Sequence, residues 1–174
     1  MLLMVDVAPN HMGSGPLSQI CYELFNPWNH ERYFHPPKFN PDGRNQTQVE
    51  QYWLGHGAWV ALPDVNTELP EVERRLYSWI RELVANYSID GLRLDTVKHI
   101  RKDFWPRFCR AAGVFALGEV WDGNPEYATT FGDFWIDGKL YGAIPELCSW
   151  AVGLCDILRD YRRLDETGTN ESVV

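Results

Sequence analysis

The fold is decided by residues 88–121, which read SIDGLRLDTVKHIRKDFWPRFCRAAGVFALGEVW. Residues 88–97 and 114–121 are short segments of the kind that form strands. Residues 103–112 between them have the character of a short helix, with Asp103 as its candidate N-cap. A strand, a helix and a second strand in succession predict two parallel strands joined by a helical crossover.

The sequence that precedes this unit adds one strand and one helix. Residues 2–8 form an apolar run that Pro9 ends, which is typical of a buried strand. A helix should begin at Pro70, a residue suited to the first helical turn, and continue to about Asn86. Its apolar residues recur at helical spacing and form one stripe: Val72, Leu76, Trp79, Ile80, Leu83 and Val84. The alternation of strands and helices predicts an α/β fold with a parallel sheet.

The remaining segments lack this alternation. Residues 13–66 are rich in Pro, Gly, Asn, Gln and aromatic residues and show no sustained period, so we expect an irregular excursion between the first strand and the first helix. After Gly123 the sequence is rich in turn-forming residues, and residues 145–163 have weak helical character. The polar residues 164–174 should form a frayed tail.

Composition limits the classes of partner. The 174 residues carry a formal net charge of -8, and no cluster of basic residues suggests binding to nucleic acid or to an anionic membrane. No apolar stretch of the sequence is long enough to span a bilayer. Eight Trp, eight Tyr and eight Phe residues would suit the flat faces of sugars, although packing in a core explains most of them equally well.

The sequence says little about the compartment. The N-terminus has no basic segment and no cleavage site of small residues, so we expect no signal peptide. The four cysteines show no spacing typical of a zinc site or a dense disulfide scaffold; they are Cys21, Cys109, Cys148 and Cys155. Glycosylation sequons begin at Asn45, Asn86 and Asn170, and they matter only if the chain enters a secretory route.

Charged residues interrupt the strand predicted at residues 88–97. Arg93 and Asp95 alternate with Leu92 and Leu94, and the period of two in a strand places the two charged side chains on one face. Burial of these charges is costly unless they pair, and the guanidinium of Arg93 should lower the pKa of Asp95. The pair can be a structural ion pair or part of a functional site.

Further polar residues lie where the predicted strands end. Glu119 is near the carboxyl end of the third strand, and Asn10 and His11 follow the first. Ligands of parallel sheets bind at this rim. An ionised Asp95 and a Glu119 whose apolar neighbours favour its protonated form would provide a nucleophile and an acid, as in retaining glycoside hydrolysis, where two carboxyls stand about 5 Å apart. The alternatives are that the carboxyls never meet and that His11 is a packed or surface residue.

Three segments resemble signature segments of the α-amylase family in order and spacing. They read DVAPNH at residues 6–11, GLRLDTVKH at residues 91–99 and GEVWDG at residues 118–123. The connecting text is similar to that of secreted fungal-type α-amylases, notably QTQVE at residues 46–50, LPD at 62–64, NYSID at 86–90 and KDFWP at 102–106. The similarity extends from about residue 4 to residue 145.

The resemblance implies part of a (β/α)8 TIM barrel with an inserted B domain. Residues 1–12 would hold barrel strand three, residues 13–66 the inserted B domain, and residues 67–163 barrel helices with strands four and five, followed by the tail at 164–174. Strands one, two and six to eight have no expected counterpart in these residues. We therefore expect a fragment with two open sheet edges.

The resemblance also implies an activity and its residues. In the family, the match of Asp95 attacks the anomeric carbon and the match of Glu119 protonates the leaving oxygen, which gives retaining endo-hydrolysis of α-1,4-glucosidic bonds in starch-like glucans. The implied substrate-binding residues are His11, Arg93, Lys98, His99 and Asp122. The implied ligands of a structural calcium ion are Asn10, Glu50, Asp64 and the backbone carbonyl of His99, all hard oxygen donors. A secreted monomer that acts on α-glucan is the pattern that the family suggests.

Two departures from the family pattern affect these expectations. The fourth signature segment, which supplies a His-Asp pair and a third catalytic carboxylate, is absent, and none of the five histidines lies beyond Glu119. We therefore expect the 174 residues alone to be catalytically inactive. Lys38, Tyr52 and Thr129 stand where secreted relatives place disulfide cysteines, which weakens the expectation of secretion.

Three alternatives to a hydrolase remain open from the sequence. A glucanotransferase would use the same covalent intermediate but pass the sugar to a hydroxyl group. A non-catalytic glucan-binding remnant would keep a sugar site without turnover. An unfolded gene-prediction product would show no cooperative thermal transition.

Overall fold

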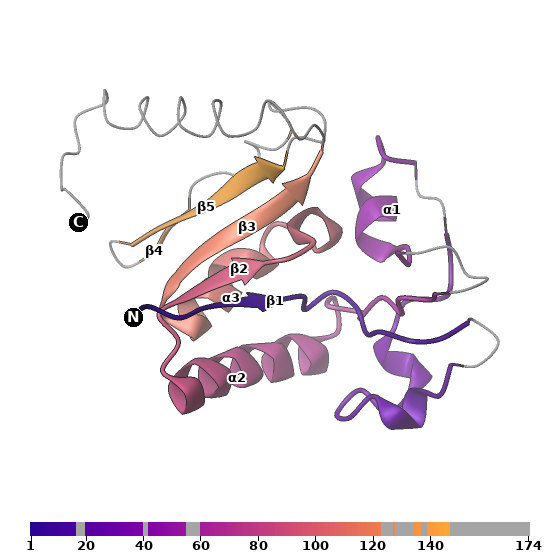
Figure 1. The fold of residues 1–174 in the computed structure, drawn as a ribbon. Helices are drawn as coiled ribbons and strands as arrows, with labels where there is room; N and C mark the ends of the chain where they lie inside the picture. Colours follow the sequence, from indigo (N-terminus) through magenta and orange to yellow (C-terminus); the bar gives the residue numbers. More distant parts are fainter. Residues whose placement is uncertain are drawn as a thin grey trace.

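A computed structural model describes residues 1–16, 20–39, 42–54, 60–122, 127, 134–136 and 139–146. Its centre is a five-stranded sheet with the strand order β1-β2-β3-β5-β4. The strands run side by side across Figure 1, and most of the described residues between 13 and 66 lie beyond the arrowheads of β1 and β2. This end of the sheet is therefore the one that the irregular excursion adjoins.

Three parallel strands form the part of the sheet that the sequence predicts. They are β1 (Met4–Val7), β2 (Gly91–Leu94) and β3 (Phe115–Trp121). The register pairs Asp6 of β1 with Arg93 of β2, and Arg93 with Leu117 of β3. Leu92 and Leu94 are buried, so the predicted alternation of apolar and charged faces in β2 is confirmed.

Two further strands extend the sheet beyond β3. Strand β5 (Lys139–Glu146) pairs with β3 in parallel, and β4 (Phe134–Ile136) pairs with β5 in antiparallel orientation. The expectation that no strand follows β3 is therefore wrong, because β5 satisfies the backbone groups along that edge of β3. The predicted helix at 145–163 is wrong for residues 145 and 146, which belong to β5. Its other residues and the predicted tail lie outside the described residues.

Helix α2 (Pro70–Tyr87) precedes β2 and matches its predicted bounds closely. Ser88 ends the helix in the left-handed conformation, at φ 50 and ψ 51. Val72, Leu76 and Ile80 of the predicted apolar stripe are buried, whereas Trp79 of the same stripe is 40% exposed. No helix in the described ranges is both long and apolar enough to cross a membrane.

Helix α3 (Phe104–Ala112) connects β2 to β3, as the sequence predicts. Gly113 ends the helix at φ 70, a left-handed conformation that a residue without a Cβ adopts easily. Asp103 occupies the N-cap position, but its side chain makes no capping hydrogen bond. Its carboxylate instead accepts Arg101 Nε at 3.1 Å, so the local ion pair replaces the expected cap.

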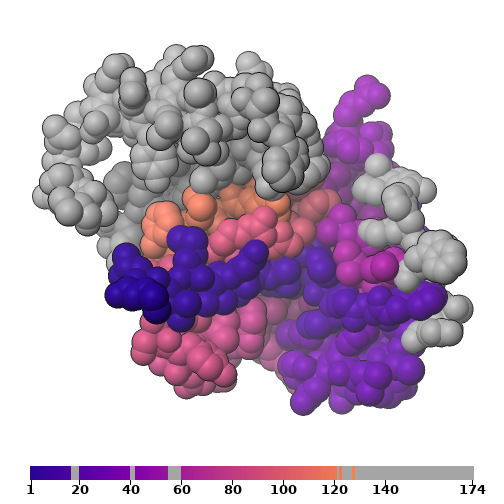
Figure 2. Space-filling model, viewed as in Figure 1, coloured from indigo at the N-terminus to yellow at the C-terminus, as the bar shows by residue number. Residues whose placement is uncertain are grey.

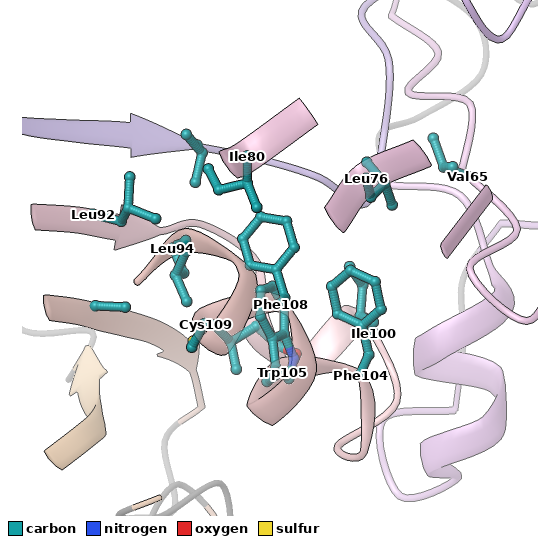
Figure 3. Packing of buried hydrophobic residues seen from close by; sticks show 14 of the residues in the cluster. Val65, Leu76, Ile80, Leu92, Leu94, Ile100, Phe104, Trp105, Phe108 and Cys109 are labelled. Atoms are coloured by element: carbon teal, nitrogen blue, oxygen red, sulfur yellow. The ribbon is translucent and has the colours of Figure 1, made fainter. Parts of the chain in front are cut away.

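Aromatic residues of α3 form the centre of the core, which Figure 3 shows from close by. The rings of Phe104 and Phe108 stack at 5.3 Å, and Trp105 meets both edge-on. They belong to one buried cluster with Leu92 and Leu94 of β2. Complete burial of a side chain of this size contributes about 2 kcal/mol of folding free energy. This packing fixes β2, and with it the charged residues on its opposite face.

The segment between residues 13 and 66 contains only short elements in its described parts. They are η2 (Tyr22–Leu24), η3 (Glu31–Tyr33) and α1 (Gln46–Gln51). Isolated bridges connect His11 with Asp64, Ser14 with Ala61, Phe34 with Val65 and Leu54 with Leu62. These bridges return the segment to the end of β1, and Figure 2 shows its violet atoms against the indigo residues that follow that strand.

Two residues of this segment that stand where secreted relatives place disulfide cysteines, Lys38 and Tyr52, lie close together. Lys38 Nζ is 5.5 Å from the centre of the Tyr52 ring, within the range of a cation–π contact. The described cysteines, Cys21 and Cys109, carry free thiols. Burial raises the pKa of Cys109 to about 12, so this thiol is chemically inert at neutral pH.

Candidate active site

The carboxyl ends of β1, β2 and β3 carry four charged side chains. Asp6 lies in β1 and is the register partner of Arg93 in β2. Asp95 follows β2, where its N–H donates to Val7 O at 2.9 Å and continues the pairing with β1. Glu119 lies in β3, one position beyond the residue that pairs with Leu94. The parallel order of the three strands brings these residues to one rim.

Arg93 joins three carboxylates at this rim, and we call these four residues the Arg93 cluster. Its Nη1 donates to both oxygens of Asp6 at 3.0 Å and to Asp95 Oδ1 at 2.6 Å. Its Nη2 lies 2.8 Å from Glu119 Oε1. One guanidinium therefore holds the side chains of Asp95 and Glu119 next to each other. The prediction that Arg93 and Asp95 share a face is confirmed.

The electrostatics of Asp95 differ from the sequence prediction. Burial raises the pKa of Asp95, and Glu119 beside it raises it further, while Arg93 acts in the opposite direction. The expectation of a lowered pKa is therefore wrong. Arg93 is shared among three carboxylates, so its charge does not offset both the burial of Asp95 and the neighbouring acid.

Thr96 connects the Arg93 cluster to the residues after β1. Its backbone is left-handed, at φ 55 and ψ 35, which costs a β-branched residue about 1 kcal/mol. In this conformation its N–H donates to Glu119 Oε2 at 3.2 Å, and its hydroxyl donates to Asn10 Oδ1 at 2.5 Å. Sequence reasoning gave Thr96 no role, because nothing in the local pattern predicts a left-handed residue directly after the strand.

The expected sugar-binding residues lie around this rim. Burial lowers the pKa of His11, and burial lowers that of His99 to about 4 with further contributions from Lys98 and His11, so both rings are neutral at neutral pH. His99 Nδ1 is 3.1 Å from Val49 O. Lys98 Nζ lies 3.6 Å from Asp122 Oδ2. The rim thus combines two neutral imidazoles with one ion pair.

The expected calcium ligands fall into two connected pairs. Asn10 and Asp64 are each 1% exposed. The backbone carbonyl of Asn10 accepts a hydrogen bond of 2.7 Å from the N–H of Val65, the residue after Asp64. Gln46 Nε2 donates to Glu50 Oε1 at 2.7 Å and to Lys98 O at 2.9 Å, which brings Glu50 to the turn that contains His99. Thr96 connects this turn to Asn10.

A metal cluster of the usual side-chain type is not seen in the described part of the chain. No group of at least three His, Cys, Asp or Glu side chains there could hold a metal ion. The set expected from the resemblance has only two carboxylates, Glu50 and Asp64, and completes its ligands with an amide and a backbone carbonyl. This donor set is chemically suited to calcium rather than to zinc.

A second group of charges lies next to Asn10 and consists of the buried His35 and Asp64 with the partly exposed Glu68; we call it the His35 cluster. His35 Nδ1 lies 2.6 Å from Asp64 Oδ2, and His35 Nε2 lies 2.8 Å from Glu68 Oε2. Burial alone lowers the pKa of His35, but its hydrogen bonds to the two carboxylates raise it to about 9. Burial raises the pKa of Asp64 to about 7, against the effect of His35. Sequence reasoning missed His35 and Glu68, which carry no local motif.

Comparison with known proteins identifies relatives over most of the chain. The family model "Alpha amylase, catalytic domain" matches residues 1–133. Alpha-amylase 1 of Lipomyces kononenkoae is 46% identical over 141 residues, which are 80% of this chain and 22% of that protein. Alpha-amylase 2 of Schwanniomyces occidentalis is 44% identical over 135 residues, which are 77% of this chain and 26% of that protein. The chain thus spans about a quarter of the length of these relatives.

Solved structures agree with this result. An alpha-amylase from Malbranchea cinnamomea superposes with a TM-score of 0.71 at 49% identity, over 75% of this chain and 28% of that chain. The alpha-amylase of Geobacillus thermoleovorans in complex with acarbose gives a TM-score of 0.63 at 34% identity, over the same shares. The expected fold class, part of a (β/α)8 TIM barrel, is confirmed. The chain belongs to the alpha-amylase family, and the match lies in the catalytic domain of that family.

Proposed function

We propose that these residues form part of a retaining glycoside hydrolase that cleaves internal α-1,4-glucosidic bonds in starch-like glucans. The observation that carries the proposal is the Arg93 cluster, in which one guanidinium contacts both Asp95 and Glu119. Carboxyls that share a guanidinium are closer to the spacing of retaining enzymes, about 5 Å, than to that of inverting enzymes. The named alpha-amylases among the relatives support the same substrate class.

The proposed reaction has two steps with opposite roles for Glu119. Asp95 attacks the anomeric carbon while Glu119 gives its proton to the departing glycosidic oxygen, so a covalent glycosyl ester forms as the C–O bond breaks. Glu119, now ionised, then takes a proton from water, which displaces Asp95 from the sugar. Two displacements at one carbon retain its configuration. Release of the first product separates the acid and base roles of Glu119 in time.

The other rim residues are proposed to bind sugar hydroxyls. His11 and His99 have lowered pKa values because they are buried, so each neutral ring has one N–H donor and one acceptor nitrogen. Lys98 and Asp122 form an ion pair beside them. Arg93 is proposed to orient Asp95 and to offset its charge before the attack. Together these groups would fix a neutral sugar by hydrogen bonds.

The proposal includes a calcium ion held by Asn10, Glu50, Asp64 and the carbonyl of His99. The residues fit such an ion in one specific respect: Asn10 is buried, faces Asp64, and its Nδ2 has no partner of hydrogen-bond geometry among the described atoms. Exchange of the amide nitrogen and oxygen would keep the bond to the Thr96 hydroxyl, which can donate or accept, and would turn an oxygen toward a cation. Calcium would supply positive charge to oxygen ligands that come from the excursion and from the segments that follow β1 and β2.

Secretion and a monomeric state belong to the same proposal. The sequon at Asn45 lies in the N-cap residue of α1, and that at Asn86 lies near the end of α2. Glycan on either asparagine in protein from a eukaryotic host would support passage through the secretory route. Unmodified asparagines in protein recovered from the medium would leave secretion supported by its location alone.

An activated substrate tests the assignment of the two carboxyls. Fluoride leaves without help from an acid, so Glu119→Gln in the full-length enzyme that contains these residues should lose starch hydrolysis but keep turnover of α-maltosyl fluoride. Asp95→Asn should lose both activities, because no covalent ester can form. The exposed Glu23→Gln is the matched control and should keep both. Equal loss of both substrates in Glu119→Gln would contradict its role as the acid.

Product analysis separates hydrolysis from transfer. Maltoheptaose incubated with the active protein should give shorter sugars only if water is the acceptor. Oligosaccharides longer than maltoheptaose would favour a glucanotransferase that uses the same Asp95 ester. Binding of maltoheptaose without any product would favour a non-catalytic glucan-binding protein.

A further inference from the structure

We infer that His35 is a positioning residue that orients the Asp64 carboxylate for calcium. The inference deepens the proposed function and rests on its calcium site. His35 has no role in the proposed reaction, yet both of its ring nitrogens contact carboxylates, Asp64 at 2.6 Å and Glu68 at 2.8 Å. The imidazole is nearly enclosed, with 8% of its side chain exposed.

The backbone fixes His35 beside Asp64. His35 N–H donates to Asp64 O at 2.9 Å, and the preceding residue, Phe34, bridges with Val65 in antiparallel orientation. The indole N–H of the buried Trp53 donates to His35 O at 2.8 Å. The two chain segments that carry His35 and Asp64 therefore form a short ladder, and the imidazole can reach Asp64 without any movement of the backbone.

The chemistry of the contacts gives the ring one orientation. An ionised carboxylate only accepts hydrogen bonds, so both nitrogens of a ring between two carboxylates act as donors. Glu68 holds Nε2 and thereby fixes the ring, and Nδ1 then fixes the plane of the Asp64 carboxylate through Oδ2. Groups that hold a metal ligand from outside in this way commonly change metal affinity by about 10- to 100-fold when they are removed.

Two shape-matched substitutions separate the contacts of His35. The amide nitrogen of Asn can occupy the position of imidazole Nδ1, and the amide nitrogen of Gln can reach that of Nε2. His35→Asn therefore keeps a donor toward Asp64, whereas His35→Gln keeps a donor toward Glu68. Glu68→Gln leaves both His35 and Asp64 in place and tests the outer contact alone.

The experiment measures calcium affinity of the 174-residue chain by isothermal titration calorimetry. We expect His35→Gln to lose about 10-fold or more in affinity, and His35→Asn to stay within about threefold of the wild type. Glu68→Gln should fall between them. Equal affinity in the wild type and His35→Gln would overturn the inference and leave the calcium site intact. No calcium binding by the wild type would overturn the calcium site together with the inference.

Thermal unfolding distinguishes positioning from a purely structural role. Each variant is melted in excess EDTA and in calcium, and the readout is the increase in Tm that calcium causes. A positioning role predicts a smaller increase for His35→Gln than for His35→Asn, even if both melt at the same temperature in EDTA. A loss of Tm in EDTA with an unchanged calcium increment would contradict the inference.

Discussion

The Arg93 cluster and the His35 cluster use the same arrangement in opposite surroundings. Each places one cation between carboxylates, with Arg93 contacting three acids and His35 contacting two. In the Arg93 cluster the side chains of Asp6 and Arg93 are 61% and 31% exposed, and those of Asp95 and Glu119 are 26% and 13% exposed. In the His35 cluster the side chains of Asp64 and His35 are 2% and 8% exposed, while that of Glu68 at its outer end is 35% exposed.

Access to water decides what each cluster can do. Charges at a partly open rim are screened, and a substrate can displace their contacts at moderate cost. Buried charges interact strongly, and loss of one partner leaves the other without compensation. The open arrangement therefore suits chemistry on a ligand, while the closed arrangement suits the fixing of a neighbouring segment.

The largest expected effect concerns turnover at the open cluster. In the full-length enzyme that contains these residues, Asp95→Asn should lower kcat for starch on the order of 10⁴-fold or more, because the nucleophile is lost. Asp6→Asn should lower kcat by less than about tenfold, since Asp6 contacts only Arg93 in the cluster and is largely exposed. Steady-state assays on soluble starch measure both. Similar losses in the two variants would remove the distinction between Asp95 and Asp6.

A large effect on stability is expected at the closed cluster. Asp64→Asn should lower the free energy of unfolding by about 2 to 3 kcal/mol, because a buried hydrogen-bonded charge pair is broken. Asp6→Asn, the same substitution at an exposed pair, should change it by about 1 kcal/mol or less. Urea unfolding in EDTA measures both values without a contribution from bound calcium. Equal destabilisation would contradict the role assigned to burial.

An intermediate effect is expected where Thr96 connects the open cluster to Asn10. Thr96→Val keeps the shape of the side chain but removes the hydroxyl that donates to Asn10 Oδ1. The buried amide would then lack a partner at this end, which should cost about 1 to 3 kcal/mol in urea unfolding. Thr96→Ser keeps the hydroxyl and is the control, so an equal loss in both variants would point to the methyl group instead.

The smallest expected effect is a pH dependence of opposite sign for two carboxyls, Asp95 of the Arg93 cluster and Glu68 of the His35 cluster. Burial and Glu119 raise the pKa of Asp95 in the folded chain, so its contribution to stability is complete below the unfolded pKa and is lost as pH rises through the folded pKa. Burial alone would raise the pKa of Glu68, but its contact with His35 lowers that pKa below the usual value. The contribution of Glu68 is therefore complete above the unfolded pKa and is lost as pH falls through the folded pKa.

Urea unfolding from about pH 3 to pH 7, which spans the usual carboxyl range, tests these signs. The stability of the wild type minus that of Asp95→Asn should decrease toward neutral pH. The stability of the wild type minus that of Glu68→Gln should increase over the same range. The same slope in both differences would contradict the opposite surroundings of the two carboxyls.

The sequence predicts most of the sheet because the signals are local. Alternation at Leu92, Arg93 and Leu94 predicts the faces of β2, and the order of elements predicts that Glu119 comes to the same rim. Strand β5 is missed because Gly142 and Pro145 weaken any local strand signal, and this strand forms against the available edge of β3. Local sequence signals thus predict the three strands that form the rim, whereas formation of β5 depends on pairing with the edge of β3.

The candidate site follows from sequence only in part, for a similar reason. A signal existed for Asp6, a charge inside an apolar run, just as it did for Arg93 and Asp95. His35 and Glu68 gave none, because their contact depends on how the excursion returns to the sheet. The pKa of Asp95 was predicted in the wrong direction, because the prediction weighed only Arg93, and burial together with the contact to Glu119 outweighs that charge.

The long separation between β1 and β2 has a consequence for synthesis in the cell. Asp6 and Arg93 are 87 positions apart, whereas Thr96 and Glu119 are 23 apart. Closing a longer loop costs more entropy, and distant contacts form later. We therefore expect β2, α3 and β3 to associate first. At the usual rate of translation, β2 is synthesised on the order of 10 s after β1. The apolar side chains of β1 are unpaired during that interval and can be bound by chaperones.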